Sequence, residues 1–306
     1  GLGPGYSVGA RNRGALPGGS VVADERGDHG RPCRHHCCLP AIVLLQAAVS
    51  ALDYSAVTEK SGDRVTQEAL SMVYTRYRFA ADFCRRRRVL EVACGPGVGL
   101  GYLARHAGEI VGGDLTGSLL GQARRSLRGV IPLVRLQAGA LPLRAASRDV
   151  IVCFEALYFF EDAEKFLREC RRVLVSQGIL LLCMVNPEWP EFNPNSSAHR
   201  YYSARQVSVL LKETGFHCNL YGAFPATTAS WRAASVAGLK RAAVAWHLIP
   251  STMDGKRLLK RLFLGPLVPF PEAVEDGMAA YAQPVPLESN QPVSGYKVLF
   301  AVGRSA

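Results

Sequence analysis

Short apolar runs and amphipathic stretches alternate through the middle of the chain. The apolar runs predict strands at 89–93, 109–113, 132–136, 149–154 and 179–185. Between them, apolar side chains recur at helical spacing and predict helices at 98–107, 117–127 and 161–174. Such alternation is typical of an α/β fold in which helices cover both faces of a parallel sheet.

Further elements flank this alternating region on both sides. A helix is expected from Gly62, because the residues after it place apolar side chains on one face: Val65, Leu70, Val73, Tyr74, Tyr77 and Ala81. Ser203 and Gln206 form a capping box that predicts a helix running to Thr214. Strands at 216–224 and 296–302 then complete the predicted sheet.

The first predicted strand runs directly into a glycine-rich loop at residues 89–99 (VLEVACGPGVG). Glycines allow a sharp turn and a close approach of the backbone to a ligand. In a dinucleotide enzyme such a loop holds a pyrophosphate, and the carboxylate of Glu91 argues against that ligand. A relaxed G-x-G-x-x-A pattern also spans 99–104, but it lies mostly inside the predicted helix rather than at the turn.

The pattern Glu91-x-x-x-Gly95-x-Gly97-x-Gly99 resembles motif I of class I S-adenosylmethionine-dependent methyltransferases, in particular the small-molecule enzymes similar to methyltransferase type 11. The resemblance covers roughly 65–218 and returns at 296–302. It implies a Rossmann-like, doubly wound sheet of seven strands, mostly parallel, whose last strand is antiparallel. It also implies S-adenosyl-L-methionine as the cofactor.

The resemblance also suggests which residues hold that cofactor. Asp114 ends the second strand, where the family places the acid that binds the ribose hydroxyls, and Leu115 follows where an apolar side chain lies on the adenine. Gln137 stands where the family usually has an Asp, and its amide oxygen can still accept from the adenine amino group. Tyr74, Tyr77 and Arg78 of the helix expected from Gly62 are candidates to reach the methionine carboxylate, with packing in the core as the alternative for the two tyrosines. The expected cofactor-binding residues are Arg78, Glu91, Ala93, Gly95, Gly97, Asp114, Leu115, Gln137, Ala138 and Phe154.

Candidate catalytic residues follow the later strands. Ligands of α/β folds bind at the carboxyl ends of the strands, which points to Glu155 and Tyr158 after one strand and Asn186 after the next. Glu155 could orient or deprotonate an acceptor, and Tyr158 could shape the path of the methyl group. His199 is a possible base in the following loop. Glu155 as a helix cap and His199 as an exposed loop residue are the structural alternatives.

Charge and local motifs bear on the acceptor. The formal net charge is +11, yet the basic residues are scattered along the chain rather than clustered as phosphate binding requires. The sequence after the fourth strand is Phe-Glu-Ala-Leu and lacks the Asn/Asp-Pro-Pro-Tyr that resembles enzymes methylating base amino groups. We therefore expect methyl transfer to an O, N or C atom of a small, lipophilic molecule. An RNA methyltransferase and a catalytically inactive cofactor-fold binding protein remain alternatives.

The chain divides into an N-terminal extension, 1–52, and a methyltransferase domain, 53–306. The extension is rich in Gly, Pro and Arg and is expected to be disordered or non-essential; its apolar run at 39–52 has the outline of a signal-peptide core. An insertion at about 225–294 is both apolar and basic, so it is expected to cap the acceptor pocket or to contact a membrane surface.

The cysteines bear on the compartment. The chain has 9 cysteines without regular spacing, which argues against a disulfide framework and favours a reduced, cytoplasmic setting. Cys94, Cys153 and Cys183 fall in or beside apolar strands and are expected to be buried. We expect no metal site, since the cluster at 33–38 lacks a partner at zinc-ligand spacing.

Overall fold

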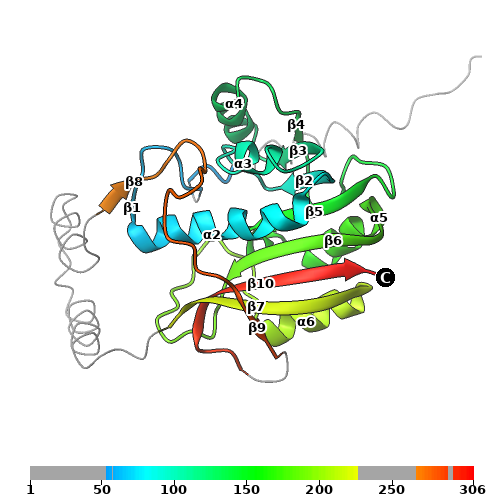
Figure 1. The fold of residues 1–306 in the computed structure, drawn as a ribbon. Helices are drawn as coiled ribbons and strands as arrows, with labels where there is room; N and C mark the ends of the chain where they lie inside the picture. The colour runs from blue at the N-terminus through cyan, green and yellow to red at the C-terminus, as the bar shows by residue number, and fades with distance from the viewer. Residues whose placement is uncertain (1–52, 57, 227–266, 289–291) are drawn as a thin grey trace, which may run out of the picture. The chain divides into compact units, whose positions relative to one another are not determined.

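The computed structural model describes residues 53–56, 58–226, 267–288 and 292–306. Their centre is a sheet in the order β4-β3-β2-β5-β6-β10-β7-β9 (Figure 1). In that order the strands are Leu133–Arg135, Glu109–Asp114, Arg88–Val92, Arg148–Phe154, Leu174–Val185, Tyr296–Ser305, Phe216–Pro225 and Val285–Leu287. The first five are parallel to one another, and β10 is antiparallel to both β6 and β7.

This arrangement confirms the predicted Rossmann-like, mostly parallel sheet with an antiparallel last strand. The predicted number of seven strands was too small, because β9 pairs with β7 as an eighth. β9 is a short edge strand that contains Pro286, and three residues are too few to show a period in the sequence.

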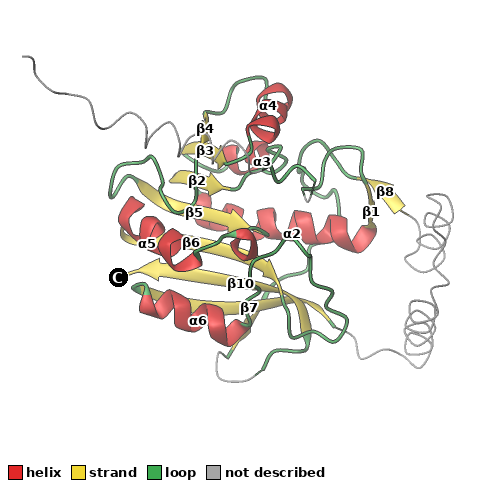
Figure 2. Ribbon diagram, turned by 180° about the vertical axis from the view of Figure 1, so that it is seen from behind, coloured by secondary structure: helices red, strands yellow, loops and turns green. Residues whose placement is uncertain are grey.

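Alternate residues of the central strands face two separate apolar cores. In β5, Val150 and Val152 belong to the core beneath α2 (Gln67–Cys84) and α3 (Leu100–Ala104). Ile151 and Cys153 belong to the opposite core, beneath α5 (Ala163–Val173) and α6 (Ala204–Glu213). Figure 1 shows α2 in front of the sheet, and Figure 2, from behind, shows α5 and α6 in front of it. A strand covered on both faces needs continuous apolar sequence, which is the signal that predicted these strands.

The first described helix begins later than the expected start at Gly62. Residues Arg64–Thr66 form β1, which pairs with β8 (Leu267–Pro269) in a two-stranded sheet. Thr66 caps α2 by accepting a hydrogen bond from the Ala69 N–H at 3.0 Å. The strand partner comes from a distant part of the chain, so helical periodicity around Gly62 gave no sign of it.

Other helix and strand boundaries differ from the predicted ones by a few residues. The helix expected at 98–107 is the shorter α3, and the one expected at 161–174 is α5, which Asp162 caps. β6 begins before 179, and its pairing with β5 is irregular where Gln177 adopts a positive φ of 61°. α4 (Gly117–Ser126) follows β3 as expected, and the Ser203–Gln206 capping box is present at α6.

The described end of the insertion packs along the outer side of α2 and α3. The Gly277 N–H donates to the Tyr74 hydroxyl oxygen at 3.2 Å, and the Ala282 N–H donates to the Thr75 hydroxyl oxygen at 3.1 Å. The Tyr102 hydroxyl donates to Asp276 at 2.7 Å. The rest of the insertion that is expected to form the cap lies outside the described residues, as do the N-terminal extension and its cysteine cluster.

Five described cysteines are buried and free, among them Cys94, Cys153 and Cys183 as expected. Burial raises the pKa of each of those three thiols above its usual value. They therefore act as small apolar residues of the core. Within the part of the chain that the structure describes, no helix has the length and apolar character needed to cross a membrane.

Candidate functional site

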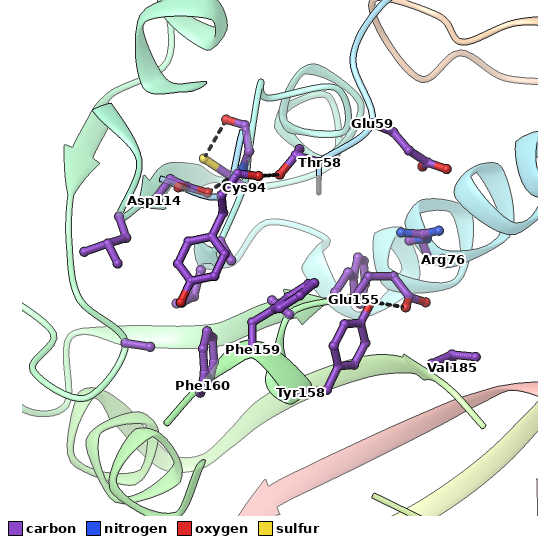
Figure 3. A pocket seen from close by; sticks show the side chains of 18 of the residues that line it. Thr58, Glu59, Arg76, Cys94, Asp114, Glu155, Tyr158, Phe159, Phe160 and Val185 are labelled. Atoms are coloured by element: carbon purple, nitrogen blue, oxygen red, sulfur yellow. Dashed lines mark hydrogen bonds between the residues drawn. The ribbon is translucent and has the colours of Figure 1, made fainter. Parts of the chain in front are cut away.

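A cavity of about 970 Å³ opens at the carboxyl ends of the central strands. Small-molecule sites occupy roughly 300–1,000 Å³, so this cavity is at the upper end of that range. Figure 3 shows Cys94 and Asp114 on one side of it, Arg76, Glu155 and Tyr158 on the other, and Phe159 between them.

Strand order divides the lining of the cavity into two halves. The Asp114 half follows β2, β3 and β4 and comprises Ala93, Gly95, Asp114, Leu115, Gln137 and Ala138. The Glu155 half lies toward β5, β6 and β10 and comprises Arg76, Glu155, Tyr158, Trp189, His199 and Lys297. The structure thus brings into one space residues that the sequence singled out for each half.

Asp114 ties the end of β3 to the glycine loop. One carboxylate oxygen accepts from the Gly95 N–H at 2.8 Å, and the other accepts from the Thr116 N–H at 2.8 Å. Burial raises the pKa of Asp114, although these backbone hydrogen bonds oppose the shift. Each oxygen keeps a further lone pair, so this carboxylate can hold the loop and still accept from a ligand.

The loop beneath Asp114 is held in an unusual backbone conformation. Ala93 and Gly95 have φ of 58° and 55°, in the left-handed region that costs a residue with a Cβ on the order of 1 kcal/mol. A Cβ at Gly95 would also come within 3.2 Å of the Thr58 side chain. Gly97 differs from the expectation, because it does not line the cavity. A Cβ there would lie 2.9 Å from Ala123, so Gly97 allows the loop to pack on α4.

Glu91 lies behind the cavity wall instead of lining it. Its side chain is 2% exposed, and one carboxylate oxygen accepts from the Tyr77 hydroxyl at 2.8 Å. The other oxygen is buried and has no hydrogen-bond partner among the described residues. Burial raises the pKa of Glu91 to about 7, against the Tyr77 hydrogen bond and the charge of Arg76. Tyr77 itself lines the cavity.

Arg76, and not the predicted Arg78, reaches the cavity from α2. Arg78 instead pairs with Asp82 at 3.0 Å and lies over the ring of Tyr281 at 5.7 Å. Two residues apart on an α-helix point about 200° apart, so the side chains of Arg76 and Arg78 leave α2 on opposite sides. Burial alone would lower the pKa of Arg76, but the nearby carboxylates of Glu155 and Glu59 raise it, and Arg76 stays cationic.

Glu155 follows β5 with a positive φ of 50°. Its N–H donates to the Cys183 carbonyl at 2.8 Å, which extends the pairing of β5 with β6 by one residue. The Tyr158 hydroxyl donates to the Glu155 carboxylate at 3.0 Å, drawn as a dashed line in Figure 3. Burial and the charge of Glu155 raise the pKa of Tyr158 above its usual value, so Tyr158 remains a proton donor. A strained residue at a strand end, held by a tyrosine, is typical of a functional site.

The remaining candidates are divided between the cavity and the core. His199 lies at the cavity and is exposed; its backbone N–H donates to the Tyr158 carbonyl at 2.8 Å. Phe154 lines the cavity and packs against Tyr77 with ring centroids 5.4 Å apart. Asn186 is fully buried and donates to the Tyr296 carbonyl at 2.7 Å, so it is a structural residue and not part of the lining.

Several lining residues carried no signal in the sequence. They come from segments far apart in the chain: Tyr54, Glu59, Trp189, Phe270 and Lys297. Lys297 pairs with Glu68 at 2.7 Å and lies 5.4 Å from the centre of the Trp189 ring. Only the packing of α2, β10 and the loop after β6 brings these groups together.

The match to known proteins covers the strands that build this cavity. A family model described as "Methyltransferase domain" matches residues 90–182. The similarity to this family is therefore shown for residues 90–182. The matched span contains the glycine loop, Asp114 and Glu155, and it ends within β6.

Curated relatives match the same part of the chain. A probable S-adenosylmethionine-dependent methyltransferase of Mycobacterium tuberculosis is 31% identical over 146 residues, which cover 46% of this chain and 52% of the relative. A phthiotriol/phenolphthiotriol dimycocerosates methyltransferase of Mycobacterium ulcerans is 37% identical over 132 residues, covering 40% of this chain and 48% of the relative. The chain thus spans about half the length of the curated relatives it matches.

A solved structure supports the methyltransferase fold. A Thermotoga maritima protein, titled a SAM-dependent methyltransferase and possible histamine N-methyltransferase, aligns with a TM-score of 0.50 and 16% sequence identity. The alignment covers 76% of this chain and 89% of that protein. At this identity the likeness concerns the fold, and it agrees with the sheet described above.

The Asp114 half fits a nucleoside cofactor of the kind this family binds. Asp114 offers free lone pairs at the end of β3, while Leu115 and Ala138 offer apolar surface beside the Gln137 amide. The backbone at Gly95 leaves no Cβ in the way. The alternative G-x-G-x-x-A pattern fits poorly, because Gly101 lies inside α3 and does not line the cavity.

Proposed function

We propose that this protein transfers the methyl group of S-adenosyl-L-methionine to an O, N or C atom of a small, lipophilic molecule. The observation that carries the proposal is the single cavity with two unlike halves. Asp114 and the glycine loop suit a nucleoside in one half, and Glu155 with Tyr158 suits an acceptor in the other. A volume of about 970 Å³ leaves room for both ligands at once.

The cofactor would be held mainly by residues after β2, β3 and β4. Asp114 would accept from the ribose hydroxyls, Leu115 would pack on the adenine, and Gln137 would accept from the adenine amino group. Arg76, in place of Arg78, is the cation available to a carboxylate. When bound, S-adenosyl-L-methionine supplies an electrophilic methyl group on its sulfonium.

The Glu155 half would align the acceptor and receive its proton. Methyl transfer is an in-line displacement, so orientation of the acceptor and exclusion of water contribute most. The Glu155 carboxylate, fixed by the Tyr158 hydroxyl at 3.0 Å, can accept a proton from an acceptor hydroxyl or amine. Tyr158 and Phe159 supply rigid aromatic walls, with ring centroids 4.7 Å apart.

The lining of the Glu155 half supports a lipophilic acceptor. Apart from its charged groups, this half is walled by aromatic and aliphatic side chains, among them Met72, Phe159, Trp189, Phe270 and Val298. Relatives from several mycobacteria are named for methyl transfer to phthiotriol and phenolphthiotriol dimycocerosates. That naming supports a small organic acceptor for this chain. The cytoplasmic location remains a prediction.

A labelled-methyl assay tests the proposal. Purified protein would be incubated with methyl-labelled S-adenosyl-L-methionine and separated lipid, polar-metabolite and RNA fractions of a cell extract. We expect label in a small-molecule fraction with the wild type and at least about 100-fold less with Glu155→Gln, because general-base catalysis contributes roughly 100-fold or more. Label confined to RNA would favour an RNA methyltransferase. Cofactor binding without transfer to any fraction would favour an inactive binding protein.

A further inference from the structure

The resemblance places Glu91 next to the cofactor, but the structure places Tyr77 between Glu91 and the cavity. Tyr77 lines the cavity, whereas Glu91 does not. The Tyr77 hydroxyl donates its proton to Glu91 at 2.8 Å, so its oxygen keeps an acceptor position for another group. A phenol that donates to a carboxylate also becomes a better acceptor, because linked hydrogen bonds polarise one another.

Tyr77 is held rigidly in this position. Its ring occupies the space next to Gly99, where a Cβ would come within 1.9 Å of ring atoms. Phe154 packs against the ring from another side with centroids 5.4 Å apart. The glycine loop, α2 and β5 therefore fix the phenol together, which is the arrangement a preorganised binding group requires.

The charges near Tyr77 match the two ends of an amino acid. Glu91 brings a buried carboxyl group with one oxygen that has no partner among the described residues, and this group places negative charge behind Tyr77 once it is ionised. Arg76, the preceding residue of α2, brings a cation to the same cavity. An ammonium beside Tyr77 and a carboxylate beside Arg76 would each meet a group of opposite character.

We propose that Tyr77 is the residue that binds the ammonium end of the cofactor's amino acid, and that Glu91 acts through Tyr77 as a positioning residue. This inference rests on the proposed function, since it needs S-adenosyl-L-methionine as a ligand. It changes the role that the resemblance suggests for Glu91, from direct contact to support of a tyrosine that the motif does not include.

Calorimetric titration with two probes tests the inference. S-adenosyl-L-methionine carries the amino acid, and 5′-methylthioadenosine has the same adenine, ribose and sulfur without it. We expect Tyr77→Phe to weaken S-adenosyl-L-methionine binding roughly 10-fold, as for one hydrogen bond to a charged group, and to change 5′-methylthioadenosine binding less than about twofold. Glu91→Gln should show the same selectivity. The double variant should lose little more affinity for S-adenosyl-L-methionine than either single variant, because the two residues act as one unit.

Tyr74→Phe is the matched control, because Tyr74 lies on the same helix but contacts Gly277 outside the cavity. We expect this variant to bind both probes like the wild type. A Tyr77→Phe protein that binds S-adenosyl-L-methionine like the wild type would overturn the inference. Equal losses for both probes would also overturn it, because they would mean that Tyr77 only ties α2 to β2. A wild type that binds neither probe would instead refute the proposed function.

Discussion

The Asp114 half and the Glu155 half of the cavity are built in different ways. The Asp114 half comes from the ends of three adjacent parallel strands and the loops that follow them directly. The Glu155 half draws on α2, the segment before it, the loop after β6, Phe270 from the segment after β8, and Lys297 from β10 itself. Cofactor recognition is therefore a local property of this fold, whereas acceptor recognition depends on packing between distant segments.

The largest expected effect falls on the Asp114 half. We predict that Asp114→Ala weakens S-adenosyl-L-methionine binding about 100-fold or more, because it removes charge-assisted hydrogen bonds and the anchor of the Gly95 N–H. Asp149→Ala is the control. Asp149 pairs with Arg88 at 2.7 Å, and both residues lie at the beginning of their strands, β5 and β2, away from the cavity. Unchanged binding by the Asp114 variant in a calorimetric titration would show that the two halves were assigned wrongly.

The next effect tests the packing of Tyr77 against the glycine loop. A Cβ at Gly99 would overlap the Tyr77 ring, and overpacking of this kind costs about 1–3 kcal/mol. We therefore predict that Gly99→Ala lowers the free energy of unfolding by about that amount in denaturant melts. Gly101→Ala is the control, since the nearest atom to its Cβ would be 3.7 Å away and alanine favours the helix. Equal stability of the two variants would mean that Tyr77 is free to move.

A smaller effect distinguishes the two arginines of α2. We predict that Arg76→Gln weakens S-adenosyl-L-methionine binding several-fold to about 10-fold, because a charged hydrogen bond to the ligand carboxylate is lost. Arg78→Gln should change binding less than about twofold, since Arg78 pairs with Asp82 outside the cavity. Parallel titrations of the two variants give the answer. The reverse order of effects would restore the prediction made from the sequence.

The smallest expected effect is a pH dependence that originates at Glu91. Burial raises its pKa from an ordinary value of 4.5 to about 7, so the folded protein holds a proton that the unfolded chain has already lost. Without ligand, this contribution to stability is present below pH 4.5 and is lost as the pH rises through 7. Cofactor binding should instead strengthen by a few-fold from pH 6 to pH 8, because an ionised Glu91 favours an ammonium nearby.

Glu91→Gln provides the control for that pH dependence. Tyr77, Arg76 and Asp114 also act on the pKa of Glu91, and they remain in this variant. We expect measurements at pH 6, 7 and 8 to show that, as the pH rises, the wild type loses stability without ligand and binds the cofactor more tightly. The variant should show neither change. The same two changes in both proteins would assign the pH dependence to another group.

The sequence predicted the parallel strands and the position of Asp114 at a strand end because these signals are local. Apolar runs specify buried strands, and a short motif places Asp114 and Gly95 at adjoining strand ends. The sequence did not predict that Arg76, and not Arg78, reaches the cavity, since the direction of a side chain depends on how α2 is rotated against the sheet. Trp189 and Lys297 were missed for a related reason: each meets the cavity only through tertiary packing.

The most direct test of the central claim is a comparison of two ligands on the wild-type protein. The claim is that the Asp114 half holds a sulfonium nucleoside and not a dinucleotide. Calorimetric titration of the wild type with S-adenosyl-L-methionine should give saturable binding of one ligand per chain, and titration with NADH should give none. Binding of NADH without binding of S-adenosyl-L-methionine would contradict the account.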